Sequence, residues 1–489
     1  MNWIKAGRRG GGLRLALAMV GLAAAVALSA ERLWLAAVQP LWFDEAWTLA
    51  IATAPDWRSV VHEAWIDVNA PLFYALAHAW TAVAGSSDLA LRIPALAAVL
   101  IAAALPLVRR VEGLKLEGRL ALSILILAWW GVDVFLAGRC YGLLLALTTA
   151  QTLAFADLAR APGGRRAWTW ASLAALSILT HYYAAILVAV QGLAYLASGR
   201  RAALKTWPAA LAFAPALAWI AWHAPRLKAY AAGDVAWHAA LGADQAAGMA
   251  GFILDPSAPA LGLVAALVLG LGFLLARNRA ADQPTALWLA AGCSLVALAL
   301  TLASGVLRPS LTARYLIPAA PGLLLGLVLM AQGMRRPALA TGGLVIVYLA
   351  SALWPGRLDA GLRSQSPYGF EAASAELTRQ GVSDVAFAWD HEVTALIPPD
   401  TLARLGGVFF RRAGASVRMH PVVTRPGDDV NRLALAAARG PRPGIIWIYN
   451  RTGRTAAALH PPQIASVDPR WTCRRTGDES IGALACWRR

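Results

Sequence analysis

The stretch LRLALAMVGLAAAVALSAERLWLAAVQPLWFDEAW, residues 13–47, places a long apolar run directly before two adjacent carboxylates, Asp44 and Glu45. The run is long enough for an α-helix to cross the hydrocarbon of a bilayer. The backbone has no water partner in hydrocarbon, so such a run must be helical. Ionisable groups are costly at membrane depth, and a carboxylate pair at its rim is therefore a candidate for function.

Apolar runs of similar length recur through most of the chain. Of the 489 residues, 58% are hydrophobic, and the mean hydropathy is +0.54. These values predict an all-α polytopic membrane domain over residues 1–354, with about eleven transmembrane helices. The predicted spans are 13–35, 89–108, 120–137, 140–158, 167–182, 183–198, 206–222, 258–276, 285–306, 315–333 and 337–354.

The N-terminus carries basic residues before its first apolar run, which would also suit a cleaved signal peptide with a weak site near Ser29. The apolar run resumes at residues 33–38, however. This continuation favours an uncleaved anchor.

The basic residues lie in short clusters between the apolar runs. With the N-terminus in the cytoplasm, 18 Lys and Arg lie on the predicted inner side, against eight on the outer side up to residue 354. The positive-inside rule supports this orientation. A nucleic-acid-binding protein would instead show a continuous basic face with interleaved aromatic residues, so the net charge of +17 does not indicate a nucleic-acid partner. We expect a multi-pass protein of the bacterial inner membrane, with residues 355–489 in the periplasm.

Residues 36–88 are predicted to form one long outer loop of the membrane domain. Its apolar stretch 71–84 is too short for a span and favours an interfacial or re-entrant helix. Counting this stretch as a span would place the basic cluster 109–119 outside and break the charge pattern.

Residues 355–489 have the composition of a small soluble α/β domain. Apolar runs of strand length occur at 385–389 and 445–449, and amphipathic helices are predicted around 370–379 and 429–439. Cys473 and Cys486 flank a turn, where an oxidising compartment permits a hairpin disulfide. Cys140 and Cys293 lie in or beside spans and are expected to be packing residues.

The candidate functional side chains fall on the predicted outer side of the membrane. A carboxylate beside a low-dielectric wall can act as a general base or help to bind a divalent cation such as Mg²⁺ or Mn²⁺. Arginine binds phosphate oxygens bidentately. Together these groups suit transfer of a polar group from a lipid phosphate. The candidates are Asp44, Glu45, His62, Glu63, Asp67, Asn69, Asp133, Arg139, Tyr141, His181, Tyr182, Tyr183, Arg308, Arg314 and Tyr315.

Structural roles for the same residues remain open at this point. The Asp44–Glu45 pair would also suit a solvated loop, and His181 with its neighbouring tyrosines would suit an interfacial anchor. Arg308 and Arg314 would suit snorkelling side chains that keep their charge in the headgroup region.

Six short motifs follow one another in a characteristic order: Phe-Asp-Glu-Ala at 43–46, Asp-Val-Asn-Ala-Pro-Leu-Phe-Tyr at 67–74, Leu-Ala-Leu-Arg-Ile-Pro at 89–94, Gly-Arg-Cys-Tyr at 138–141, Thr-His-Tyr-Tyr at 180–183 and Ala-Arg-Tyr-Leu-Ile-Pro at 313–318. None of them is specific alone. In this order along a multispan chain they resemble the GT-C membrane glycosyltransferases, in the family 39 branch of protein O-mannosyltransferases and aminoarabinose transferases. The resemblance covers residues 13–354.

This resemblance implies an inverting transferase that uses a polyprenyl-phosphate-linked sugar, with a lipid, glycan or protein as acceptor. Asp44 would be the base that activates the acceptor hydroxyl, and Glu45 would assist in acceptor or cation binding. Asp67 matches the second acidic position of the long loop, while Arg139 and Arg314 would hold the lipid phosphate. Further substrate-binding positions are Asn69, Asp133, Tyr141, His181, Tyr182, Arg308 and Tyr315.

Two motifs depart from the family pattern. Relatives often carry the sequence Asp-x-His-Pro-Pro at the second acidic position. This chain has Asn69 and Ala70 in place of the His and the first Pro. Relatives also often carry Glu-Ala-Arg, where this chain has Ala137-Gly138-Arg139. Asp133, one helical turn before Ala137, is the expected replacement for that acid.

Two other functions compete with this interpretation. A transporter or flippase for a lipid-linked substrate predicts buried charges near mid-span and broken helices in paired halves, whereas these charges cluster at one rim. A non-catalytic membrane scaffold predicts that the acids of the first loop can be replaced without consequence.

Overall fold

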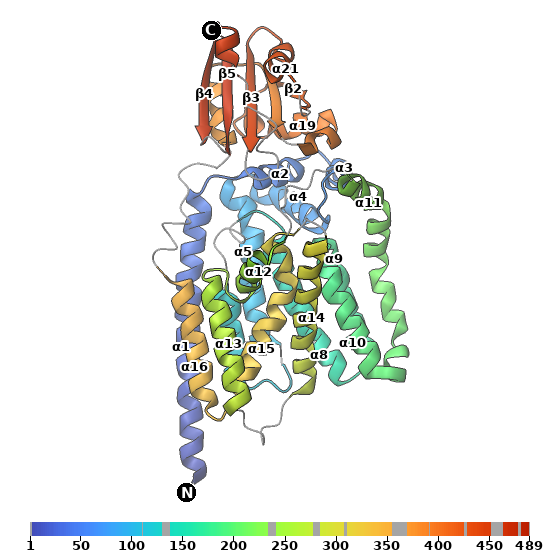
Figure 1. Cartoon of the computed structure of the whole chain (residues 1–489), viewed down its shortest axis with the longest axis vertical. Coiled ribbons are helices and arrows are strands. Elements are labelled where there is room, and N and C mark those ends of the chain that lie inside the picture. Colours follow the sequence, from blue (N-terminus) through green and yellow to red (C-terminus); the bar gives the residue numbers. More distant parts are fainter. Residues whose placement is uncertain are drawn as a thin grey trace. The chain divides into compact units, whose positions relative to one another are not determined.

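The computed structural model describes residues 2–109, 111–129, 137–232, 241–276, 284–307, 311–354, 369–390, 392–424, 428–450, 463–477 and 481–488, with side chains from residue 12 onward. The chain divides into two compact units, each built from three segments. The helical unit comprises Met1–Leu35, Arg92–Trp222 and Ala240–Gly361. The mixed unit comprises Ala36–Leu91, His223–Ala239 and Leu362–Arg489. Figure 1 shows the elements of both.

Six helical stretches within the described residues are long and apolar enough to cross a membrane. They coincide with the predicted spans that begin at residues 13, 89, 140, 258, 285 and 315. The stretches are α1 (Asn2–Val38, apolar from Gly12), α5 (Asp88–Val108), α8 (Tyr141–Arg160), α13 (Pro259–Ala276), α14 (Thr285–Leu307), and η2 (Ala313–Ala319) with α15 (Ala320–Gln332).

The other five predicted spans contain helices that are shorter or less apolar. They are α6 (Leu116–Ala128), α9 (Gly164–Thr180), α10 (Ala184–Leu204), α11 (Ala214–Ala232, preceded by η1, Trp207–Phe213) and α16 (Pro337–Ala352). The predicted span 120–137 includes residues outside those that the structure describes. The helix α12 (Ala243–Leu254) lies in no predicted span.

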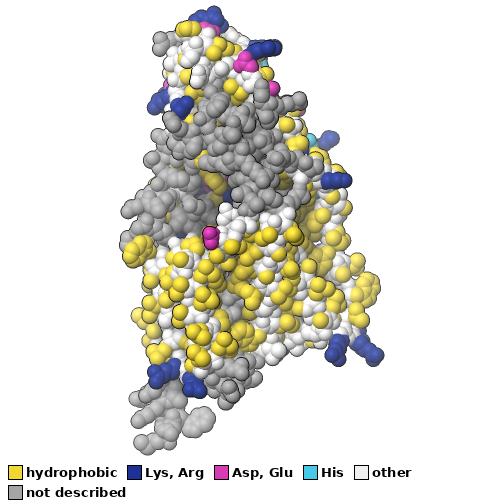
Figure 2. All heavy atoms as spheres, in the orientation of Figure 1, with side chains coloured by type: hydrophobic (Ala, Val, Ile, Leu, Met, Phe, Trp, Pro, Cys, Tyr) yellow, Lys and Arg dark blue, Asp and Glu magenta, His cyan; other side chains and the backbone are white. Residues whose placement is uncertain are grey.

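The helical unit has the surface that a membrane requires. Along α13, only Gly262 and Leu269 are buried, while leucines such as Leu267 and Leu274 are exposed. Figure 2 shows hydrophobic side chains over the visible face of this unit. Inside the unit, a Cβ added to Gly142 would lie 2.2 Å from the Ala95 carbonyl oxygen. Glycine therefore permits α8 and α5 to touch closely, as small residues do in membrane bundles.

The mixed unit contains a five-stranded sheet in the order β2-β1-β3-β5-β4. The predicted strands 385–389 and 445–449 lie in the parallel neighbours β1 and β3. The parallel strands are β1 (Asp384–Asp390), β2 (Arg418–Val422) and β3 (Pro443–Asn450), and the hairpin strands are β4 (Trp471–Gly477) and β5 (Ile481–Arg488). Cys473 and Cys486 are register partners in this hairpin and are joined by a disulfide. The all-α polytopic class with a small C-terminal α/β domain is confirmed.

Helices of two chain segments complete the mixed unit. The predicted short helix at 71–84 is α4, and the predicted amphipathic helices are α18 and α21. The first segment supplies α2 (Phe43–Ala52), α3 (Trp57–Ile66) and α4 (Leu72–Ala84). The C-terminal segment supplies α18 (Phe370–Arg379), η3 (Glu392–Leu396), α19 (Pro399–Gly406), α20 (Val408–Arg412), α21 (Val430–Ala437) and α22 (Ile464–Val467).

The long first loop shares a hydrophobic core with the sheet. Successive side chains of a strand point to opposite faces, and Phe387 of β1 faces the cluster that contains Phe43 and Leu49 of α2. Ala386 faces a second cluster that contains Trp471 and no residue of the first loop. Residues 36–91 are therefore part of the mixed unit, whereas the sequence alone assigned residues 36–88 to the membrane domain.

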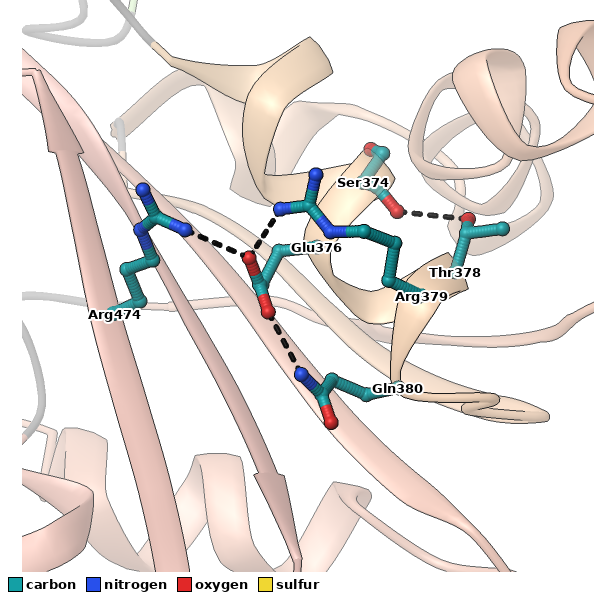
Figure 3. A network of polar contacts seen from close by, with 6 residues as sticks. All are labelled: Ser374, Glu376, Thr378, Arg379, Gln380 and Arg474. Atoms are coloured by element: carbon teal, nitrogen blue, oxygen red, sulfur yellow. Dashed lines mark hydrogen bonds and ion pairs between the residues drawn. The ribbon is translucent and has the colours of Figure 1, made fainter.

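A polar network fastens α18 to β4 on the surface of the same unit. Glu376 accepts hydrogen bonds from Gln380 and Arg474, each at 2.9 Å, and pairs with Arg379 (Figure 3). The network joins a helix to a strand 98 residues away in the chain. Hydrogen bonds to a charged group contribute more than neutral ones, so this carboxylate stabilises the packing of α18.

Candidate active site

The two carboxylates of α2 have different environments. Both lie in the first helical turn, where the helix dipole favours negative charge. Glu45 is buried, and its Oε2 accepts a hydrogen bond from the Trp42 backbone N–H at 3.1 Å. Asp44 is half-buried, and its backbone carbonyl accepts from the Thr48 hydroxyl. Glu45 is thus engaged in closing the helix, while the Asp44 carboxylate is the more accessible of the two.

Asp67 and Asn69, both predicted as site residues, lie together in the turn after α3. Asp67 Oδ1 accepts from the Val68 backbone N–H at 2.8 Å, and Oδ2 accepts from Asn69 Nδ2 at 3.0 Å. The Tyr74 hydroxyl also donates to Oδ2. Tyr74 was missed as a site residue although it lies in the same sequence motif. Three neutral donors on one carboxylate make Asp67 an anchor of this turn.

Two side chains of α11 reach the end of α3 within the mixed unit. His223 Nε2 lies 2.9 Å from the Trp65 carbonyl oxygen, which only accepts, so this nitrogen carries the proton. Arg226 Nε donates to the Ile66 carbonyl at 2.9 Å. A cation at a helix C-terminus is stabilised by the exposed carbonyls and the helix dipole. Both His223 and Arg226 also interact electrostatically with Asp67.

Arg226 has a second partner, because its Nη1 donates to the Leu396 carbonyl of η3 at 2.6 Å. The Glu63 carboxylate of α3 forms a similar link with Arg404 of α19 at 3.0 Å. Glu63 is buried, whereas Arg404 remains partly exposed. The polar end of the first loop is therefore tied to the C-terminal segment at two points.

A second group of predicted residues gathers in the helical unit. The His181 ring pairs with the rings of Tyr141 and Tyr315, at centroid distances of 6.0 and 4.9 Å. Tyr183, one of the outer-side candidates, stacks on Tyr315 at 5.1 Å. The guanidinium of Arg314 lies 5.5 Å above the Tyr141 ring. Three separate chain segments thus meet in one aromatic cluster.

Two arginines make this cluster cationic. Arg139 and Arg314 both interact electrostatically with Tyr141 and with His181. Arg139 is buried, and it lies just before α8, which begins at Tyr141. Helix N-termini and arginines both favour phosphate oxygens. The arrangement can therefore hold an anion. We call Arg139, Tyr141, His181, Arg314 and Tyr315 the arginine cluster.

The remaining predicted residues have other positions. Tyr182 accepts a hydrogen bond at its hydroxyl from Trp219 Nε1 of α11 at 2.8 Å. Asp133 and Arg308 lie outside the described residues. Among the residues that the structure describes, no group of three His, Cys, Asp or Glu side chains could hold a metal ion. The predicted Mg²⁺ or Mn²⁺ requirement stays a prediction.

No protein-family model matches the sequence, and no curated protein matches it. Two solved structures of ArnT from Cupriavidus metallidurans are similar in fold. The apo structure has a TM-score of 0.57 and 10% identity, over 99% of this chain and 98% of that chain. The structure bound to undecaprenyl phosphate has a TM-score of 0.55 and 9% identity, over 96% and 97%. The chain has the fold of ArnT, which is that of the GT-C membrane glycosyltransferases.

Proposed function

We propose that the protein transfers a sugar from a polyprenyl phosphate to an acceptor hydroxyl on the periplasmic face of the bacterial inner membrane. The observation that carries this proposal is the arginine cluster, which is suited to a phosphate. It occurs in a chain that shares its fold with an ArnT structure bound to undecaprenyl phosphate. The acidic first loop supplies carboxylates for the other half of the reaction.

In this mechanism the acceptor hydroxyl loses its proton to Asp44 as its oxygen attacks the anomeric carbon of the sugar. The bond between that carbon and the phosphate oxygen breaks, and polyprenyl phosphate leaves with the electron pair. Attack opposite the leaving group inverts the anomeric configuration. Arg139 and Arg314 stabilise the charge that develops on the phosphate. No step is assigned to a cation.

The roles of the two loop carboxylates follow from their surroundings. Asp44 is half-buried in the first turn of α2, and we assign this more accessible carboxylate as the base. Asp67 accepts three hydrogen bonds and holds the turn rather than exchanging a proton. The mechanism therefore needs one base, which is Asp44.

The test is a reconstituted transfer assay. The purified protein in liposomes receives undecaprenyl-phosphate-linked sugars, with lipid, glycan and protein fractions as acceptors, and release of undecaprenyl phosphate is measured. We expect release that depends on one acceptor fraction. Movement of the intact lipid-linked sugar between leaflets without release would indicate a flippase instead. Mass spectrometry of glycolipids and glycoproteins from a deletion strain then identifies the missing product.

A further inference from the structure

Two aromatic side chains beside Asp44 contact the same tryptophan of the sheet. The Phe43 ring centroid lies 4.6 Å from that of Trp389, and the Trp47 centroid lies 5.9 Å from it. Phe43 also faces Phe370 of α18 at 6.4 Å. All three pairs are tilted, a geometry that aromatic rings favour over face-to-face stacking. Trp389 is therefore the shared partner of Phe43, directly before Asp44, and of Trp47, three residues after it.

Packing decides how α2 is oriented, because the helix has only ten residues. Isolated helices of this length are marginal in water. Phe43 is adjacent to Asp44 in the chain and is 4% exposed, so its ring fixes the rotation of α2 about its axis. Trp47 lies one helical turn after Asp44, and residues at this spacing are neighbours on the helix surface. A displacement of the Phe43 or Trp47 ring would therefore change the orientation of the Asp44 carboxylate.

Trp389 lies at the carboxyl end of the central part of the sheet, one residue before the end of β1. The strand pairs with β2 as far as Ala388 and with β3 along its whole length, where Trp389 is the register partner of Ile448. A side chain on such a strand is a firmer support than one on a loop. The contact connects the rigid part of the mixed unit to the helix that carries the proposed base.

We infer that Trp389 is a positioning residue for Asp44, acting through the rings of Phe43 and Trp47. The C-terminal sheet thereby sets the angle at which the carboxylate meets the acceptor. This inference rests on the proposed function for its catalytic part only. The structural part, that Trp389 orders α2, is independent of what the protein transfers.

The experiment compares Trp389→Ala and Trp389→Phe with a matched control, Trp471→Ala. Trp471 is a buried tryptophan of the same sheet, in the cluster that contains no residue of the first loop. Each variant is purified at full length, and only preparations with a cooperative thermal transition are compared. Donor KM and kcat are measured by release of undecaprenyl phosphate, and amide hydrogen exchange is followed across Phe43–Ala52.

For Trp389→Ala we expect kcat to fall by about tenfold or more with little change in donor KM, because a small displacement of a catalytic group is costly. Exchange across α2 should rise by about tenfold, since the helix loses its support. Trp389→Phe keeps a ring at this position and should recover most of both properties. Trp471→Ala should leave kcat and α2 exchange near their wild-type values.

Unchanged α2 exchange in Trp389→Ala would overturn the inference, as would an equal loss of kcat in Trp471→Ala. If the wild-type protein releases no undecaprenyl phosphate from any donor, the proposed function fails. The exchange comparison then still decides whether Trp389 orders α2.

Discussion

The Glu45 carboxylate accepts a hydrogen bond from the backbone N–H of Trp42 at 3.1 Å and so closes the first turn of α2. The first backbone N–H groups of a helix have no partner within it, and a side chain at the third helical position commonly satisfies one of them. Two neighbouring carboxylates therefore have separate tasks. Glu45 shapes the helix, and Asp44 is the carboxylate that we propose as the base.

Replacing Glu45 separates these tasks experimentally. Glu45→Ala should lower the free energy of unfolding by about 1 kcal/mol, the usual cost of losing a helix-capping interaction. Glu45→Gln keeps an acceptor oxygen and should retain most of the stability and most of the transfer activity. Thermal unfolding and turnover are measured on both variants. A Glu45→Gln variant that is stable but inactive would show that the charge of Glu45 acts in catalysis.

Replacing either arginine of the arginine cluster by a neutral residue should lower the affinity for the phosphate of undecaprenyl phosphate. Hydrogen bonds to charged groups contribute about 1.5–3 kcal/mol. Arg139→Gln and Arg314→Gln should therefore weaken product inhibition by undecaprenyl phosphate by about 10- to 100-fold. Arg379→Gln is the control, because Arg379 is an exposed partner of Glu376 in the mixed unit. Equal inhibition constants in all four proteins would remove the phosphate role from the cluster.

The Cys473–Cys486 disulfide tests both stability and topology. It closes a segment with a sequence separation of 13 residues, for which loop entropy predicts about 3 kcal/mol of stabilisation. We expect Cys473→Ser to lower the free energy of unfolding of the C-terminal segment by that amount, measured from its thermal transition. In cells, thiol labelling before and after reduction should show the pair oxidised, as in a periplasmic domain. Two thiols that react without prior reduction would place the domain in a reducing compartment.

The hydrogen bonds of Glu376 should make the stability of the mixed unit depend on pH in the acidic range. Hydrogen bonds from Gln380 and then Arg379 lower the pKa of its carboxyl from 4.5 to about 2. A depressed folded-state pKa contributes stability above pH 4.5, which is lost as the pH falls toward 2. Unfolding monitored between these pH values should therefore show a steeper decline for the wild type than for Glu376→Gln. Parallel declines would mean that this network does not supply the acid sensitivity.

Much of the fold could be predicted from the sequence, because a chain segment that crosses hydrocarbon must satisfy its backbone hydrogen bonds internally and is therefore helical. Long apolar runs such as 285–306 had to be helices, and the short runs 385–389 and 445–449 had strand length. The packing of the first loop was not predictable. Trp47 has the appearance of an interfacial residue, and nothing in the sequence pairs it with Trp389, more than 300 residues later.

The candidate site shows the same division between local and distant signals. Asp67 and Asn69 are two residues apart, and their contact follows from one motif. His223 and Arg226 were not predicted, because the partners of both are backbone carbonyls about 160 residues away. Every residue has such a carbonyl, so the sequence does not indicate which one is contacted. Arg139, His181 and Arg314 could be predicted as candidates because each lies in a short motif at the end of an apolar run.

The measurement that tests the central claim most directly is transfer by Asp44→Asn. The variant keeps the size and polarity of the side chain but cannot accept a proton. It should insert into the membrane at the wild-type level and bind undecaprenyl phosphate with unchanged affinity. Its kcat should fall by about 100-fold or more, the range expected when a general base is lost. Wild-type turnover by Asp44→Asn would contradict the assignment of Asp44 as the base.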